Sequence, residues 1–162
     1  MSIIKVETYT LMGIEKDIQQ EHFRNDHQKA IINLVYTFNW VRDQMQGQLA
    51  DHLLTMQQYN ILRILRGAKQ PLSTLQIRER MLDKMSDTSR IVDRLIVKEL
   101  VKKTTCKRDK RLVDVVITDK GLDLLKELDT YSKDMDKVLG NLTETEAQQL
   151  NVLLDKVREK AE

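Results

Sequence analysis

Apolar side chains recur with helical spacing in the N-terminal part of the chain. Between Asn25 and Met45 they fall at i, i+3, i+4 and i+7, which predicts one long helix with an apolar stripe. The stripe consists of Ile31, Leu34, Val35, Phe38, Val41 and Met45. Ile32, Tyr36 and Trp40 recur at i+4 on a different side of the same helix. Two apolar faces indicate either burial at the centre of a monomer or contact with a second subunit.

A second helical pattern follows, and residues that break helices end it. It predicts a helix from about Met56 to Arg66, with Gly67 ending the helix. The residues predicted to pack inward are Ile61, Leu62, Ile64 and Leu65. Pro71 then interrupts the chain, because proline lacks the amide hydrogen that a continuing helix needs.

Two short helices are predicted next, separated by a polar junction at residues 83–85. Ser73 and Gln76 have the spacing of a capping box, which opens a helix through about Met81. Ser86 is predicted to cap the following helix, with Asp87 in its first turn. The buried side of that helix is predicted to be Ile91, Val92, Leu95 and Ile96. Two short helices joined in this way are typical of a helix-turn-helix.

The period then changes from helical to extended. Residues 100–106 and 112–117 are rich in β-forming side chains and flank a polar tip, so they predict a β-hairpin. Thr118 can cap a further helix that carries Leu122, Leu125, Leu128, Tyr131 and Met135 and ends at about Leu139, before Gly140. Thr143 and Glu146 form another predicted capping box. The stripe of the last helix is Leu150, Leu153, Leu154 and Val157.

Composition places the chain among globular proteins, because 41% of its residues are hydrophobic and 32% are charged. No run approaches the roughly 18 apolar residues of a membrane span. Residues 1–5 lack the basic and apolar pattern of a secretory signal. We therefore expect a cytoplasmic protein with no membrane partner. Cys106 is the only cysteine, which excludes an intramolecular disulfide and a thiolate-rich zinc site, and we expect no cofactor.

The net charge of +2 conceals an uneven distribution. Residues 60–111, here called the basic segment, contain 15 Lys or Arg and 6 Asp or Glu, a local charge of +9. The rest of the chain carries −7. A basic segment between acidic flanks is typical of a lobe that binds a polyanion, although chance would give the same count in some sequences.

The helix-turn-helix lies inside the basic segment. A recognition helix presents its N-terminal residues to base edges in the major groove of DNA. The residues predicted to do so here are Ser86, Asp87, Thr88, Ser89 and Arg90, followed by Arg94 one turn later. Arg90 can donate two parallel hydrogen bonds to guanine. The alternative is that Ser86 and Asp87 only cap the helix and that Arg90 is solvated.

The hairpin tip carries a second group of charged residues. Asp109 and Arg111 are two apart, so in extended chain they project to one side, where the carboxylate can brace the guanidinium. A braced arginine suits the narrow, electronegative minor groove. The alternative is an ordinary exposed ion pair, worth about 1 kcal/mol or less. Lys107, Arg108 and Lys110 would follow phosphates, which adds affinity without sequence information.

These segments together resemble a known family. The stretch from Leu54 to Leu125 is similar to the DNA-binding core of the MarR family, the regulators named for multiple antibiotic resistance. The similar pieces are, in order, LTMQQYNILRIL, LSTLQIRERM, SDTSRIVDRL and RDKRLVDVVITDKGLDLL. The last piece contains the family's Asp-x-Arg signature at Asp109 and Arg111 and its Leu/Ile-Thr-x-x-Gly pattern at Ile117, Thr118 and Gly121. The terminal helices match the family's dimerisation region, so the resemblance omits only the first dozen or so residues.

The resemblance implies an obligate homodimer that binds a near-palindromic operator in double-stranded DNA with two recognition helices and two wings. Most relatives repress transcription. By match to the motif, Arg111 would enter the minor groove and Asp109 would hold it, while Arg90 would face the major groove. Ser73 and Thr74 would approach phosphate.

Glu99 departs from the family pattern, which usually has glycine before Leu-Val. If this backbone is left-handed, Glu99 costs roughly 1 kcal/mol or more. The resemblance also implies a small phenolic or other aromatic ligand, held between the dimer helices and the DNA-binding lobe. The candidates are Tyr36, Trp40, Met56 and Tyr59, although aromatic residues at helical spacing are more often core. Cys106 lies in the predicted wing, whereas peroxide-sensing relatives place their cysteine near the N-terminal helix, so no redox role is expected.

We therefore expect a mainly α protein, a winged helix-turn-helix lobe plus a helical dimerisation region, with about six helices and one β-hairpin wing. The predicted domains are 1–53 and 119–162 for dimerisation and 54–118 for DNA binding. The expected function is a sequence-specific DNA-binding transcriptional regulator, a repressor responsive to a small ligand. The alternative is a winged-helix protein-interaction module without DNA binding. No enzyme is expected, since no phosphate-cradling glycine loop occurs and His22 and His27 lie about 140° apart on a helix.

Overall fold

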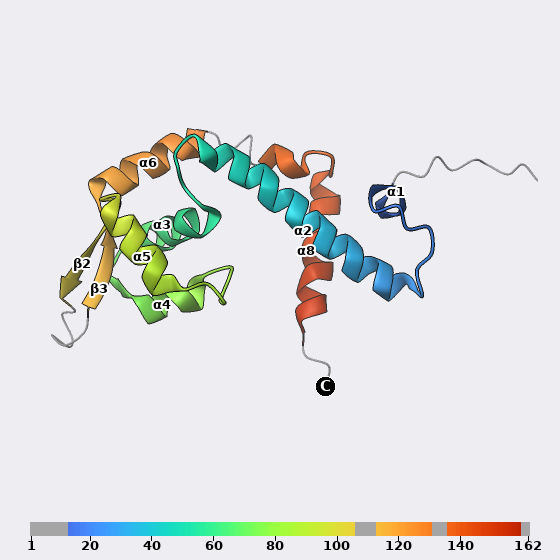
Figure 1. The fold of residues 1–162 in the computed structure, drawn as a ribbon, viewed down its shortest axis with the longest axis horizontal. Coiled ribbons are helices and arrows are strands. Elements are labelled where there is room, and N and C mark those ends of the chain that lie inside the picture. The colour runs from blue at the N-terminus through green and yellow to red at the C-terminus, as the bar shows by residue number, and fades with distance from the viewer. Residues whose placement is uncertain (1–12, 106–112, 131–135, 160–162) are drawn as a thin grey trace, which may run out of the picture. The chain divides into compact units, whose positions relative to one another are not determined.

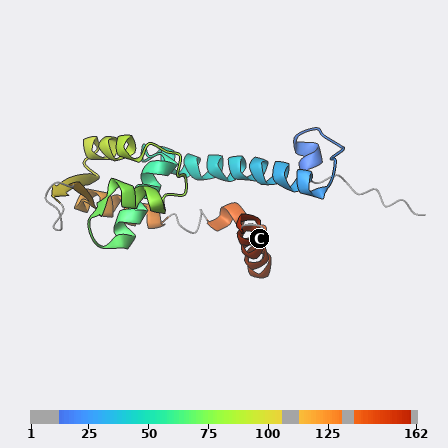
Figure 2. The ribbon, with the colours of Figure 1, turned by 90° about the horizontal axis from the view of Figure 1, so that it is seen from below.

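The computed structural model describes residues 13–105, 113–130 and 136–159. Its contacts divide the chain into two compact units, residues 1–43 and 44–162, which are described separately below. The first contains the short helix α1 (Ile14–Asp17) and most of α2 (Asp26–Ala50). Figure 2 shows α2 as one continuous helix, which confirms the long helix predicted from the apolar stripe.

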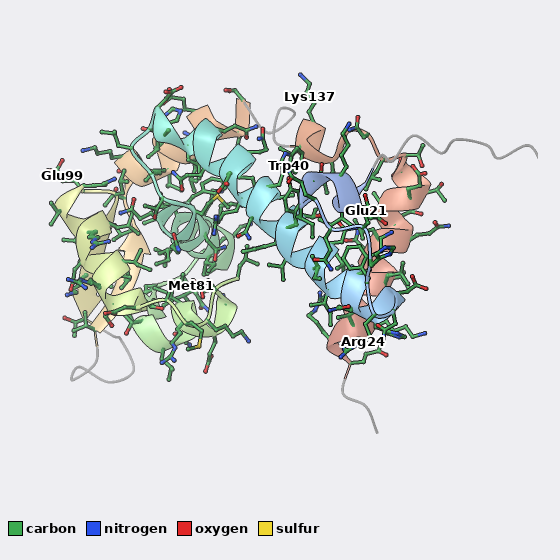
Figure 3. All side chains as sticks on the ribbon, turned by 45° about the vertical axis from the view of Figure 1, so that its right-hand side comes forward. Glu21, Arg24, Trp40, Met81, Glu99 and Lys137 are labelled. Carbon is green, nitrogen blue, oxygen red and sulfur yellow. The ribbon has the colours of Figure 1, made fainter. Side chains whose placement is uncertain are left out.

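The apolar faces of α2 are exposed in the single chain. Ile31 is 64% exposed and Phe38 is 62% exposed on the predicted stripe. On the other side, Tyr36 and Trp40 are exposed, and Trp40 is labelled in Figure 3. Leu49 is the one buried residue that the described part of this helix contains. The exposure favours contact with a second subunit over burial at the centre of a monomer.

Helix α3 (Met56–Ala68) begins at a capping box that the sequence analysis did not identify. Thr55 Oγ1 accepts a hydrogen bond from the Gln58 amide at 3.2 Å, and Gln58 Oε1 accepts one from the Thr55 amide at 3.2 Å. The prediction that Gly67 ends this helix was wrong. The helix runs through Gly67 to Ala68, and Lys69 adopts the left-handed conformation, with a φ of 52°. A glycine inside the last turn costs helix stability but does not prevent the turn from forming.

The helix-turn-helix consists of α4 (Thr74–Arg80) and α5 (Thr88–Val97), which pack against each other and against α3. The capping box of Ser73 and Gln76 is confirmed. The prediction that Ser86 caps α5 was wrong by one residue. Asp87 is the cap, and its carboxylate accepts from the Arg90 amide at 3.1 Å. The Ser86 hydroxyl instead donates to Asp83 Oδ2 at 2.5 Å.

Three strands form one antiparallel sheet in the order β1-β3-β2. The hairpin of β2 (Val101–Thr105) and β3 (Val113–Ile117) is confirmed, with Val101 opposite Ile117 and Thr105 opposite Val113. Strand β1 (Leu72–Ser73), which pairs with β3, was not predicted. Two residues are too few to produce an alternating pattern. The hairpin tip, with the predicted contacts Lys107, Arg108, Asp109, Lys110 and Arg111 and with Cys106, lies outside the described residues.

Helix α6 (Asp119–Thr130) closes the lobe and packs on α3. Thr118 caps it as predicted, since its hydroxyl accepts from the Gly121 amide at 3.1 Å. The predicted continuation to Leu139 passes through residues outside the described part, and a 3-10 helix, η1, covers Lys137–Leu139. The last helix, α8 (Glu144–Arg158), starts at the predicted capping box of Thr143 and Glu146. Its apolar stripe is mostly exposed.

One core holds α3, α4, α5, α6 and the sheet together, and we call residues 54–130 the winged lobe (Figure 1). Fully buried members are Leu54, Ile61, Leu62, Leu72, Ile77, Val92, Leu95, Val101, Val115, Leu125 and Leu128. The predicted inward side of α5 is thus confirmed at Val92 and Leu95. Mainly helical structure with a small antiparallel sheet confirms the predicted fold class. In the described ranges, no helix is long and apolar enough to cross a membrane.

Candidate nucleic-acid interface

The start of α5 forms one wall of a surface groove, and α4 forms the other. We call this hollow of about 430 Å³ the α4–α5 groove. Its lining consists of Thr74, Leu75, Arg78, Met85, Ser86, Asp87, Thr88 and Ser89. Five of these eight residues belong to the predicted DNA-binding set. The fold thus brings residues of two segments into one groove, whereas the sequence shows only the order of these segments along the chain. Leu75, Arg78 and Met85 were missed.

A second groove flanks α5 on the side of α3. It is lined by Thr55, Gln57, Gln58, Ser86, Asp87, Arg90, Ile91 and Arg94. Arg90 and Arg94 are exposed and lie one turn apart on α5, as the sequence analysis predicted for residues that face DNA. The first turns of α5 therefore carry short polar groups and two arginines between two hollows, which is the arrangement of a helix that can enter a wide groove.

Thr88 differs from its neighbours, because its side chain points into the protein. The residue is 5% exposed, and its hydroxyl donates to Met81 Sδ at 3.3 Å. Its polar group is therefore used in packing α5 against the end of α4. A base contact by Thr88 would require its hydroxyl to leave Met81, and this contact stays a prediction.

The turn before α5 is held by one carboxylate. Asp83 accepts from the Met85 amide at 3.0 Å through Oδ1 and from the Ser86 hydroxyl at 2.5 Å through Oδ2. These bonds, the Ser86 bond foremost, lower the pKa of the Asp83 carboxyl. The Leu82 amide donates to Asn60 Oδ1 of α3 at 3.1 Å. The turn is thus fixed to the lobe before any ligand arrives.

The other end of α5 is fixed by a left-handed residue. Glu99 has a φ of 62°, its amide donates to the Ile96 carbonyl at 2.8 Å, and the Leu100 amide donates to the Leu95 carbonyl at 3.0 Å. This pair of bonds is a Schellman motif, in which glycine is the usual residue. The structure therefore has the left-handed backbone that the sequence analysis considered at Glu99, labelled in Figure 3. Lys120 Nζ donates to Glu99 Oε2 at 2.9 Å and holds the pKa of that carboxyl below its usual value.

The hairpin is tied to α5 by charge. Lys103 Nζ of β2 lies 3.0 Å from Asp93 Oδ1 of α5, and both side chains are more than half exposed. The pair contributes little stability, because exposed ion pairs are typically worth less than about 1 kcal/mol. It does link β2, at the base of the predicted wing, to α5.

Comparisons with known proteins now bear on this geometry. The family model of the MarR family matches residues 54–113, which is most of the winged lobe. The crystal structure of a MarR transcription factor from Planctomyces limnophilus is 32% identical, covers 83% of this chain and 98% of that chain, and superposes with a TM-score of 0.63. The chain belongs to the MarR family.

Two further relatives extend the comparison. The HTH-type transcriptional regulator MhqR of Bacillus subtilis (strain 168) is 27% identical over 131 residues, which are 80% of this chain and 89% of the relative. A mutant MarR from E. coli, crystallised in complex with operator DNA, is 21% identical and covers 91% of this chain and 100% of that chain, with a TM-score of 0.74. At that identity the likeness establishes the fold.

Within this MarR-family chain, the predicted ligand residues fall in different surroundings. Tyr59 is 6% exposed and belongs to the core, where Arg63 lies 5.7 Å from its ring centroid. Met56 is half-buried and packs against the same core. Tyr36 and Trp40 are exposed on α2. The core interpretation thus holds for Tyr59, whereas a ligand site at the other residues stays a prediction.

Proposed function

We propose that this MarR-family protein is a homodimeric repressor of transcription that binds a near-palindromic operator in double-stranded DNA. The observation that supports it most is the start of α5, where the exposed Arg90 and Arg94 line one of two surface grooves in a lobe rich in positive charge. A base-reading helix needs exposed hydrogen-bonding groups at its N-terminal end and cations around it for phosphates.

Each group of residues has a distinct proposed role. Arg90 donates to a guanine edge in the major groove, and Arg94, one turn further along α5, contacts the same half-site. Ser73 and Thr74 of the α4 start approach the phosphate backbone. At the wing tip, Arg111 enters the minor groove, held by Asp109, and the lysines and Arg108 beside them follow phosphates.

The dimer is proposed to form through the terminal helices. The apolar stripes of α2 and α8 are exposed to water in the single chain, which is energetically unfavourable. Packing against a second copy of the chain would bury these stripes without a further partner. A two-fold dimer presents two copies of α5, which explains why the operator would be near-palindromic. We place this dimer in the cytoplasm, together with the DNA it regulates, and assign it no catalytic activity.

Control by a small aromatic ligand is also proposed, with Tyr36 and Trp40 as the contacts. Trp40 is the single tryptophan, so its fluorescence reports directly on binding near α2. Titration with a panel of phenolic carboxylates should change the emission of the wild type at ligand concentrations that also release DNA. A ligand that releases DNA without changing the emission would contradict the placement at Trp40.

Unbiased selection of bound duplexes tests the proposed function. The expected outcome is an enriched near-palindrome. Arg90→Ala should relax specificity at one base position in each half-site, by roughly 1 to 3 kcal/mol, while Arg111→Ala should weaken binding and leave the dimer folded. Arg24→Ala, at an exposed cation before α2, is the control and should bind as the wild type does. Uniform weakening across all sequences by Arg90→Ala would make that residue a phosphate contact instead.

A further inference from the structure

Two large apolar side chains are exposed in the groove where the polar DNA contacts are proposed. Met85 is 92% exposed and Leu75 is 63% exposed. Both line the α4–α5 groove, together with Thr74, Arg78 and the residues from Ser86 to Ser89. Single exposed apolar residues are ordinary on protein surfaces, but two in one groove form an apolar surface that a bound partner can cover.

Met85 is held in this exposed position by its backbone. Its amide donates to Asp83 Oδ1, and the same carboxylate binds the hydroxyl of Ser86, the next residue. These bonds fix the backbone of the turn at the surface, where Met85 is exposed. Leu75 is fixed as well, because it lies in the first turn of α4, which the capping box of Ser73 and Gln76 closes. The exposure of both side chains is thus built into the local structure.

The surroundings indicate what the two side chains contact. Arg78 lines the same groove, and Arg90 and Arg94 line the groove on the other side of α5. A partner that matches these side chains has an apolar group for Met85 and Leu75 and negative charges on both sides of it for the arginines. The major-groove edge of an adenine–thymine pair is such a partner, since it presents the C5-methyl group of thymine between two phosphate backbones.

Resting on the proposed function, we propose that Met85 and Leu75 are specificity-determining residues that contact thymine methyl groups in each half-site. Arg78, one turn after Thr74 on α4, contacts the phosphate beside that thymine. The apolar pair thus reads a base pair that Arg90 does not. The selected operator is therefore expected to contain an invariant thymine in each half-site, beside the position that Arg90 specifies.

Replacement of thymine by deoxyuridine tests the proposal, because it removes the methyl group and keeps the hydrogen-bonding edge. In the selected operator, each thymine is replaced in turn and the dissociation constant is measured by fluorescence anisotropy. At one or two thymines in each half-site, the wild type should bind the deoxyuridine-substituted operator about threefold to tenfold more weakly than the unsubstituted operator. This is the effect expected for the loss of one buried methyl group. In Met85→Ala or Leu75→Ala that penalty should shrink to less than twofold at the matching position.

Leu82→Ala supplies the matched control, since Leu82 is 85% exposed in the same turn but does not line the groove. This variant should keep the full deoxyuridine penalty. A selected half-site without thymine, no penalty at any thymine, or an equal penalty in the wild type and both groove variants would overturn the proposal. Each of those results leaves sequence-specific binding intact, whereas failure of the proposed function would appear as no preference among duplexes at all.

Discussion

Glu99 occupies a backbone conformation that suits glycine, at the end of the recognition helix. Its φ of 62° brings the β-carbon close to its own backbone, and this contact destabilises the fold. The exposed ion pair with Lys120 offsets little of this destabilisation. Glu99→Gly should therefore raise the free energy of unfolding by about 1 kcal/mol. Urea denaturation measures the change. Glu99→Ala, which removes the ion pair but keeps the β-carbon, should not stabilise the protein, and an equal gain in both variants would contradict the strain.

Gly121 is required for a different reason, the close approach of two elements. A β-carbon at this position would lie 2.4 Å from the Leu100 carbonyl oxygen and 2.8 Å from Ile117 Cγ1. Gly121→Ala should therefore destabilise the protein by about 2 kcal/mol or more, because the backbone of Leu100 or α6 must shift. Gly47→Ala is the matched control. Gly47 lies in α2 with nothing within 4 Å of its β-carbon position, so alanine should stabilise by about 0.5–1 kcal/mol. Thermal melts that rank the two variants otherwise would refute the packing argument.

The sequence predicts single residues well where the signal is local and poorly where a distant group decides. The capping boxes at Ser73 and Thr143 were predicted from partners three residues apart, whereas the box of Thr55 and Gln58, which has the same spacing, was missed. The choice between Ser86 and Asp87 as the cap of α5 was not predictable, because serine and aspartate are both good caps and the sequence does not show which side chain the Arg90 amide meets. Thr88 had the polarity of a base contact, and only packing reveals that its hydroxyl meets Met81.

Between elements, a two-bonded ion pair joins the ends of α3 and α6. Arg66 donates to Asp129 Oδ2 at 2.6 Å and to Oδ1 at 3.1 Å, and the pKa of the Asp129 carboxyl is lowered chiefly by this contact. A carboxyl with a lowered pKa in the folded state stabilises the fold above the unfolded-state pKa of about 3.9, and that contribution is lost as the pH falls through the folded-state pKa. The pair is partly exposed, so its contribution is about 1 kcal/mol or less.

Asp129→Asn should therefore lower stability at pH 7, and the difference from the wild type should shrink as the pH falls below about 3.9. Unfolding curves at several pH values measure this. Asp123→Asn is the control, because among the described residues Asp123 pairs with the exposed Lys126 on the same helix, and the variant should show no difference. A constant deficit of Asp129→Asn at all pH values would mean that packing, and not the charge, holds the two helices.

Element type was predictable wherever a period extended over several turns or strand residues. Helices α2, α3 and α5 follow from apolar spacing, and the hairpin of β2 and β3 follows from β-forming side chains on both sides of a polar tip. Strand β1 did not, because its two residues acquire their structure from β3, more than 40 positions away in the chain. The candidate interface was likewise half predictable. The polar residues of the interface were predicted because they lie at the N-terminal end of α5. Leu75, Arg78 and Met85 were not, because they line the same groove only as a result of the packing of α4 against α5.

At the scale of the whole molecule, the exposed stripe of α2 predicts dependence on a second chain. Phe38→Lys places a charge in the middle of this stripe and should raise the dissociation constant of the dimer at least about tenfold, since an unpaired charge is costly to bury. Thr37→Lys, on the polar side of the same helix, is the control and should leave the dimer intact. Sedimentation at low micromolar concentration distinguishes them. Equal dimerisation of both variants would place the interface elsewhere.

The most direct test of the account is a titration of the purified dimer against its selected operator and against a scrambled duplex of equal length, at several salt concentrations. The operator should bind at least about 1,000-fold more tightly than the scrambled duplex, and the logarithm of the affinity should fall linearly with the logarithm of the salt concentration. Equal affinity for both duplexes, or an affinity that salt does not change, would contradict the claim that this winged lobe reads DNA.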